Sequence, residues 1–162
     1  MLKQFVFLFI LLTLSFFGFS NQLVSNEGPE RHFGTAQYLT SDEYLSLDEV
    51  RQSDPLDWQS IEIEDASFGF DSRHFWLQIP LLNIQSSTSP WFLRSKYPLL
   101  DTIDVYLLAD EELVQEFHTG DSLPFRQRPI EQPNFVFPLD IKTDKTYSIY
   151  LHVQTTSSLQ LA

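Results

Sequence analysis

The chain has 162 residues and carries 22 acidic residues against 10 lysines and arginines, which gives a formal net charge of −12. A surface this negative argues against nucleic acid as a partner, because it repels the phosphate backbone. The absence of cysteine excludes disulfides, thiolate catalysis and cysteine-based zinc sites. Aromatic residues make up 15% of the chain, a share that suits a β-sandwich whose facing sheets are filled by large side chains.

The N-terminus has the features of a secretory signal peptide. Lys3 supplies a positive charge, and the run from Phe5 to Phe19 is almost wholly apolar. This run is shorter than the roughly 20 apolar residues that a transmembrane helix needs. Because Gly18 and Ser20 are small, we expect residues 1–20 to be cleaved off after Ser20. The sequence therefore predicts export, with a bacterial periplasm as the natural setting; an uncleaved anchor and a buried core helix are the alternatives.

A polar leader and one domain are expected after the signal peptide. Residues 21–37 have few apolar positions and contain a Gly-Pro pair, which indicates a flexible leader or an extended entry strand. Residues 38–162 have the size of a single domain with one core. Near its start, Thr40 with Glu43 and Ser46 with Glu49 both have capping-box spacing, so we expect one short N-terminal helix within residues 40–52.

A period of two begins at Trp58, and it predicts β-strands. Strands are expected around residues 61–63 and over 74–82, 91–97, 102–108, 113–118, 135–141, 146–154 and from 158 onward. We interpret Ser67–Ser72 as a turn and Asp110–Glu112 as the turn of a hairpin. Pro80 should fall at a bulge or a strand end, because it cannot donate a ladder hydrogen bond. This series of short strands predicts an all-β fold, a sandwich or jelly roll.

No catalytic motif is evident. The four histidines, His32, His74, His118 and His152, lack metal-ligand spacing, and the acidic turn at residues 110–112 has no EF-hand pattern. Nucleophile motifs and a phosphate-binding glycine loop are also missing from the sequence. We therefore predict that the protein is not an enzyme and holds no metal and no cofactor. A pair of glycosidase carboxylates remains open as a third hypothesis.

The long loop over residues 119–133 contains the strongest binding signal. Arg126 and Arg128 lie there close to Asp121, and guanidinium groups on a rigid scaffold can fork onto carboxylates, phosphates or sugar hydroxyls. The alternative is that each arginine bonds backbone carbonyls or an acidic neighbour such as Asp121 or Glu131, and so holds the loop.

Aromatic residues provide a second binding signal. Trp91 and Tyr97, together with Trp76 and Tyr106, can form a platform for a sugar. Core filling is the alternative for Trp76 and Trp91.

Several motifs in fixed order resemble one family. They are F-W-L-x-x-x-L-x-N at 75–83, W-F-L and Y-P-L-L-D-x-I-D-V-Y within 91–106, T-G-D-S-L-P-F-x-x-R-P at 119–129, F-P-L at 137–139 and Y-L-H-V-Q-T at 150–155. The chain is similar, over residues 38–161, to the type 2 extracellular domain of bacterial seven-transmembrane receptors with diverse intracellular signalling modules (7TMR-DISM).

This resemblance implies a jelly-roll-like β-sandwich, akin to carbohydrate-binding modules, in the periplasm. It also implies a small-molecule ligand, such as a carbohydrate, and a signal passed through seven helices to a cytoplasmic diguanylate cyclase or histidine kinase. Of the family's loop positions, Arg126, Arg128 and Asp121 carry over. His152 departs from the pattern, since members often have arginine there. The chain stops where the last strand should finish, so we expect a truncated receptor fragment or a stand-alone version.

The sequence thus favours a periplasmic ligand-binding sensory domain of a membrane receptor. A protein–protein interaction or dimerisation domain without a small-molecule ligand is the alternative. An exposed apolar sheet face, with Arg126 and Arg128 bonded internally, would favour that second hypothesis.

Overall fold

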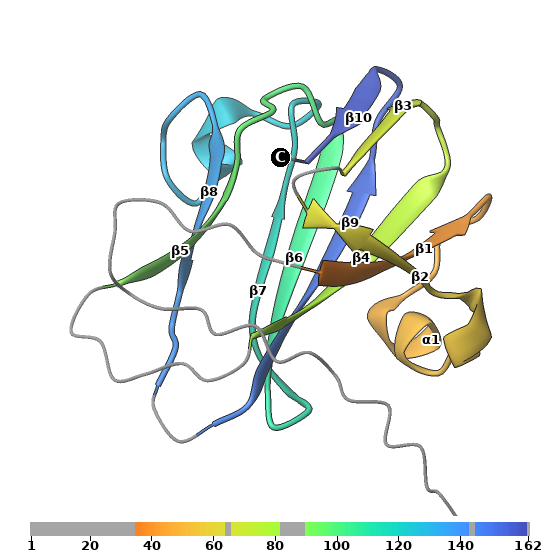
Figure 1. Cartoon of the computed structure of the whole chain (residues 1–162). Coiled ribbons are helices and arrows are strands. Elements are labelled where there is room, and N and C mark those ends of the chain that lie inside the picture. The colour runs from red at the N-terminus through yellow and green to blue at the C-terminus, as the bar shows by residue number, and fades with distance from the viewer. Residues whose placement is uncertain (1–34, 64–65, 82–89, 143–144, 162) are drawn as a thin grey trace, which may run out of the picture.

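A computed structural model describes residues 35–63, 66–81, 90–142 and 145–161. The predicted signal peptide and its cleavage after Ser20 lie outside these residues, as do His32 and most of the predicted leader. The body consists of antiparallel strands in two layers (Figure 1). The prediction of an all-β sandwich with one short helix is confirmed.

A six-stranded sheet forms the larger layer, in the order β2-β1-β4-β9-β6-β7. Its strands are β1 (Thr35–Ser41), β2 (Gln59–Glu62), β4 (His74–Leu81), β6 (Thr102–Ala109), β7 (Glu112–Thr119) and β9 (Tyr147–Gln154). Two pairs form the other layer: β3 (Ser67–Phe70) with β10 (Ser158–Gln160), and β5 (Trp91–Ser95) with β8 (Phe135–Leu139). From β2 to β10 every connection changes sheet except the β6–β7 hairpin, as in a jelly roll.

The main core lies between the two layers. Odd-numbered residues of β4, β6 and β9 point inward because side chains alternate along a strand, and every one of them is buried. They pack against the apolar residues Leu93, Phe135, Phe137, Leu139 and Leu159 of the smaller sheets. The alternation expected for residues 146–154 is confirmed by this arrangement.

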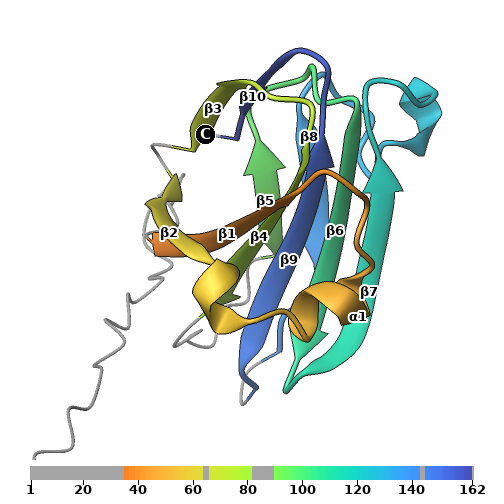
Figure 2. The same cartoon turned by 90° about the vertical axis from the view of Figure 1, so that its right-hand side faces the viewer.

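The outer face of the large sheet carries a second apolar cluster beneath residues 42–58, which we call the cover segment. This segment contains α1 (Leu47–Arg51) and the 3-10 turn η1 (Pro55–Asp57), and Figure 2 shows both in front of the sheet. The cluster consists of Val50, Trp76, Tyr106, Leu108 and Tyr150, with Leu45, Leu47 and Trp58 packed against it. Trp76 is therefore a core residue, the alternative considered for it.

The capping box of α1 is formed by the second of the two predicted pairs. The Ser46 amide donates to the Glu49 carboxylate (2.8 Å), and the Glu49 amide donates to the Ser46 hydroxyl (3.4 Å). The pair of Thr40 and Glu43 forms no cap, because Thr40 belongs to β1. That strand begins at Thr35, inside the range predicted as leader.

The prediction of a turn at Ser67–Ser72 was wrong for its first part. Ser67–Phe70 is strand β3, paired with β10, with Gly69 at a φ of 68°. Its glycine and polar neighbours resemble turn residues, but they occupy a short strand next to a register shift in β10. Pro80 lies one residue before the end of β4, as expected, and beyond Gln78, the last residue of β4 that pairs with β1.

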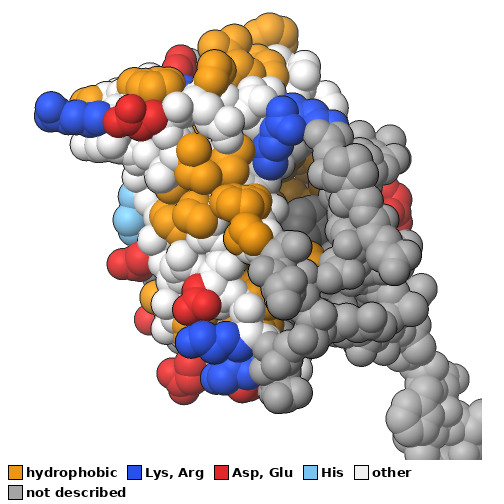
Figure 3. All heavy atoms as spheres, turned by 90° about the vertical axis from the view of Figure 1, so that its left-hand side faces the viewer, with side chains coloured by type: hydrophobic (Ala, Val, Ile, Leu, Met, Phe, Trp, Pro, Cys, Tyr) orange, Lys and Arg blue, Asp and Glu red, His pale blue; other side chains and the backbone are white. Residues whose placement is uncertain are grey.

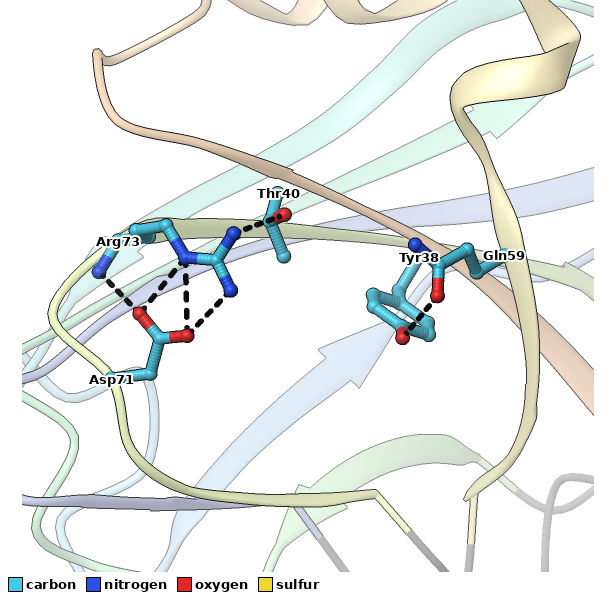
Figure 4. A network of polar contacts seen from close by, with 5 residues as sticks. All are labelled: Tyr38, Thr40, Gln59, Asp71 and Arg73. Carbon is cyan, nitrogen blue, oxygen red and sulfur yellow. Dashed lines mark hydrogen bonds and ion pairs between the residues drawn. The ribbon is translucent and has the colours of Figure 1, made fainter.

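Polar contacts fix the edge of the large sheet next to His74 (Figure 4). Arg73 donates to the Asp71 carboxylate (2.7 Å) and to the Thr40 hydroxyl (3.0 Å). The pKa of Asp71 is lowered mainly by its hydrogen bonds from Arg73. The start of β4 is thus tied to β1 immediately before His74.

Candidate functional site on the outer sheet face

Four outward-pointing residues form a row across four neighbouring strands. Trp76 of β4 pairs directly with His152 of β9, His152 pairs with Asp104 of β6, and Asp104 pairs with His118 of β7. His74 lies two residues before Trp76, on the same face of β4. All histidines of the described residues therefore gather at one place, although they are far apart in sequence.

Hydrogen bonds connect these side chains into one network. Asp104 binds His152 Nδ1 through one carboxylate oxygen (2.8 Å) and His118 Nδ1 through the other (3.0 Å). His152 Nε2 lies 3.0 Å from His74 Nδ1. An ionised carboxylate only accepts hydrogen bonds, so both imidazoles donate to Asp104 through Nδ1. The remaining ring nitrogen of His152 is then shared with His74.

The network runs from a buried centre to exposed ends. His152 is 2% exposed and the Asp104 side chain 11%, whereas the His118 side chain is 54% exposed. Tyr44 of the cover segment is 53% exposed, and its ring stands nearly perpendicular to those of His74 and His152, at 5.8 and 5.3 Å. We call His74, Asp104, His118, His152 and Tyr44 the outer-face cluster.

The surroundings of the cluster change the proton affinities of its members. Burial, and repulsion from the neighbouring His152, lower the pKa of His74. Burial, with contributions from the Asp104 carboxylate and from Tyr44, raises the pKa of Tyr106. The indole of Trp76 packs against His152 (5.1 Å), and its buried Nε1 has no hydrogen-bond partner among the described residues. The centre of the site is thus poorly solvated, which makes every added charge costly.

A bulge in the β6–β7 hairpin places His118 in the row. The hairpin turns at Asp110 and Glu111, both with positive φ, and pairs Leu108 with Leu113. The next pair is Leu107 with Gln115, which leaves Val114 unpaired. This extra residue shifts the register by one, so that His118 instead of Phe117 lies opposite Asp104. Phe117 points inward and packs on Phe137 (5.5 Å).

The analysis of sequence motifs missed this cluster because it looked for ligands close together in the chain. Alternation along residues 146–154 and 102–108 already indicates that His152 and Asp104 point outward. The sequence shows no sign of strand order or of the bulge, and both are needed to bring His74 and His118 to them.

The arginine of the predicted binding loop serves the loop itself. The Arg128 side chain is 6% exposed; it donates to the carbonyl oxygens of Gln132 (3.1 Å) and Pro133 and approaches Asp121 at 3.4 Å. It also lies over the Phe135 ring at 4.3 Å. These are the contacts of the structural alternative. A ligand would have to replace them to reach the Arg128 guanidinium.

Arg126 and Asp121 occupy the exposed side of the same loop. Arg126 belongs to the 3-10 turn η3 (Phe125–Gln127) and is exposed, and Asp121 is exposed beside Arg128. The loop is closely fitted at Gly120, because a Cβ there would lie 2.0 Å from the carbonyl oxygen of Asp101.

The predicted aromatic platform does not form as one surface. Trp76 and Tyr106 are buried and stack on each other on the outer face (5.7 Å). Trp91 and Tyr97 are half-buried and pack against the main core instead. The four rings therefore belong to two different clusters, because their strands lie in opposite layers.

The acidic residues considered for calcium have protein partners. Asp101 accepts hydrogen bonds from the amide (2.7 Å) and hydroxyl (2.8 Å) of Thr156, and Asp110 accepts one from the Thr146 amide (3.0 Å). Over the described ranges, no three His, Asp or Glu side chains converge in a way that could hold a metal ion.

Comparison with known protein families decides what kind of domain this is. The model of the 7TMR-DISM extracellular 2 family matches residues 34–162, almost the whole described body. The chain belongs to this family. This 7TMR-DISM domain is accordingly a periplasmic sensory domain of a membrane receptor of the seven-transmembrane class. No curated protein matches the chain, and no helix in the described part of this 7TMR-DISM domain is long and apolar enough to cross a bilayer.

Proposed function

We propose that this sensory domain detects a small hydroxylated molecule of the carbohydrate class at the outer-face cluster. The observation that carries the proposal is the row of hydrogen-bonded side chains that runs from buried His152 to exposed His118. Sugar recognition needs hydrogen-bonding groups of fixed direction and an aromatic ring against which apolar C–H groups can pack. His118 and Tyr44 supply these two elements at the exposed rim of the cluster.

The fixed geometry of the row supports binding here. Asp104 holds the ring of His118 by its Nδ1, which leaves Nε2 directed away from the carboxylate, 3.8 Å from the Glu116 carboxylate. His118 Nε2 and Glu116 can therefore meet hydroxyl groups without first losing rotational freedom. Preorganisation of this kind reduces the entropic cost of binding.

Other places in the described part of the molecule are less suitable. The cavity between the layers measures about 40 Å³, far below the several hundred Å³ of a typical small-molecule site. In the loop over residues 119–133, Arg128 is already bonded to backbone carbonyls. Arg126 and Asp121 remain as exposed groups there, and so the loop is the comparison site for the experiment below.

A ligand at this rim would contact the cover segment directly. Tyr44 precedes α1, whose Val50 is buried against the outer-face apolar cluster. A sugar that packs on Tyr44 would therefore alter how the start of the cover segment lies on the sheet. We propose this change in packing as the output of the domain.

The test is a panel of mono- and disaccharides, sialic acid among them, followed by thermal shift and by NMR chemical shift changes. We expect at least one sugar to perturb His118 and Tyr44, and the substitutions Tyr44→Ala and His118→Ala to weaken its binding by about tenfold each, the loss of roughly one hydrogen bond or stacking contact. Arg126→Ala, an exposed change in the comparison loop, should leave binding unchanged. Perturbations that map to the loop and vanish in Arg126→Ala would transfer the site there. A panel without any perturbation would contradict the proposal.

A second candidate function is protein–protein interaction or dimerisation. Figure 3 shows hydrophobic side chains gathered on the face that carries β5 and β8. On these strands Phe92 is 47% exposed and pairs with Pro138 across the ladder. Light scattering over a concentration series tests this candidate: a dimer that Phe92→Ser dissociates would support it, and a monomer at all concentrations would count against self-association.

A further inference from the structure

The pair formed by His74 and His152 can hold a variable number of protons. His152 donates its Nδ1 hydrogen to Asp104, and so the bond between its Nε2 and His74 Nδ1 needs one hydrogen placed between the two rings. When both rings are neutral, His74 Nδ1 carries this hydrogen. One added proton fits without any movement, because it can occupy His74 Nε2, while the shared hydrogen can then lie on either ring.

A second added proton cannot be accommodated in the same way. Both facing nitrogens would then carry hydrogens at a separation of 3.0 Å, and two cationic rings would stack at 5.2 Å. The single carboxylate of Asp104 cannot offset both charges, since it also binds His118. The bond between the two rings must then break, and the half-buried His74 is the ring that can move, because His152 is enclosed.

We propose that the His74–His152 pair is a proton-dependent switch whose second protonation separates the two rings and releases the start of the cover segment, residues 42–46, from the sheet. Tyr44 is the connecting residue, because its ring packs against both imidazoles. The rest of the cover segment stays in place through Val50 and Trp58, which belong to the outer-face apolar cluster. The switch is thus a local change in packing.

The charged and titratable groups around the pair come from three neighbouring elements. They are Asp104 and Tyr106 of β6, Glu116 and His118 of β7, and Tyr44 of the cover segment. Asp104 favours the first proton. Protonation of His118 would add positive charge on the other side of Asp104 and would thereby disfavour the second proton on the pair.

The direction of the pH effect follows from His74. Burial and repulsion from His152 lower its pKa below the value in an unfolded chain, about 6.5. The unfolded chain therefore binds more protons than the folded domain as the pH falls below that value. The stabilising contribution of His74 is complete above the unfolded pKa and is lost as the pH falls through the folded one. Acidification should accordingly loosen this part of the domain.

The test uses the full-length protein of this chain without any sugar, so that it is independent of the proposed carbohydrate function. NMR with labelled histidine and tyrosine measures the cross-peak between the rings of Tyr44 and His152 at pH 7.5 and pH 5. We expect the cross-peak to disappear at the lower pH in the unmodified domain. In His74→Gln it should persist at pH 5, because the glutamine amide donates to His152 Nε2 and cannot be protonated.

His118→Gln is the matched control, since His118 binds the same carboxylate but faces no second imidazole. This variant should lose the cross-peak on acidification as the unmodified domain does. Persistence of the cross-peak at pH 5 in the unmodified domain would overturn the proposal. Its loss in His74→Gln would do so as well, since the release would then have another cause. Neither result would affect the sugar-binding experiment.

Discussion

The Arg128 loop and the outer-face cluster both hold a nearly buried basic side chain, and they differ in what that side chain can do. Arg128 keeps its charge at every relevant pH and donates to fixed carbonyl oxygens of Gln132 and Pro133. His152 can gain or lose a proton, and its partners are an ionisable carboxylate and a second imidazole. One group stabilises a loop, and the other can respond to its surroundings.

This comparison separates two meanings of a buried charge in a sensory domain. Arginine in a loop attracts attention as a ligand-binding residue, yet the contacts of Arg128 are internal. Histidines scattered along a sequence attract none, yet three strands and a bulge bring them together. Burial with saturated partners indicates a structural role. Burial with a proton to exchange and an exposed end indicates a place where an input can act.

Deletion of Val114 should have the largest effect on the cluster side of the comparison. Without the bulge, Phe117 would lie opposite Asp104, and His118 would point into the core beside Phe137. Loss of the Phe117 packing and burial of an imidazole should lower the free energy of unfolding by about 4 kcal/mol. Urea denaturation measures this change. Val114→Ala keeps the residue count and should change stability by less than about 1 kcal/mol at this half-exposed position. Equal stability of the deletion and the parent would show that the bulge does not set the register.

Arg128→Met tests the other side of the comparison. It should lower the free energy of unfolding by about 2 kcal/mol, because the carbonyl oxygens of Gln132 and Pro133 lose their donor in a part-buried position. The loss should be the same at pH 7.5 and pH 5, since arginine does not titrate in this range. Arg126→Met, at the exposed position of the same loop, should stay within about 0.5 kcal/mol. A large effect of Arg126→Met with a small one of Arg128→Met would reverse the roles assigned to the two arginines.

Much of the fold could be predicted from the sequence because its strands alternate clearly. The segments that became β6, β8 and β9 have apolar residues at every second position, and the turn at Asp110 and Glu111 accommodates positive φ. The capping box at Ser46 and Glu49 predicted α1 by the same kind of local signal. Elements without such a signal were missed: β3 contains a glycine and turn-like neighbours, and β1 begins in a stretch without a clear period.

The candidate site was harder to predict, because it depends on contacts between residues far apart in the chain. The pairing of Asp104 with His152 follows from strand order, and the pairing with His118 follows from one unpaired residue. Neither leaves a trace in residue spacing. Conversely, Arg128 stood out in the sequence as a cation in an acidic chain, but sequence alone could not tell a ligand-binding arginine from one bonded to its own loop.

The most direct test of the account is a pH titration of the imidazole nitrogens of His74 and His152 by NMR. A coupled pair should take up its two protons in separate steps, with His74 protonated below the ordinary histidine range. In His152→Asn, whose amide can still donate to Asp104, the pKa of His74 should rise towards about 6.5, the value of a free histidine. Independent titration of the two rings, with His74 unchanged by His152→Asn, would contradict the claim that the outer-face cluster acts as one proton-binding unit.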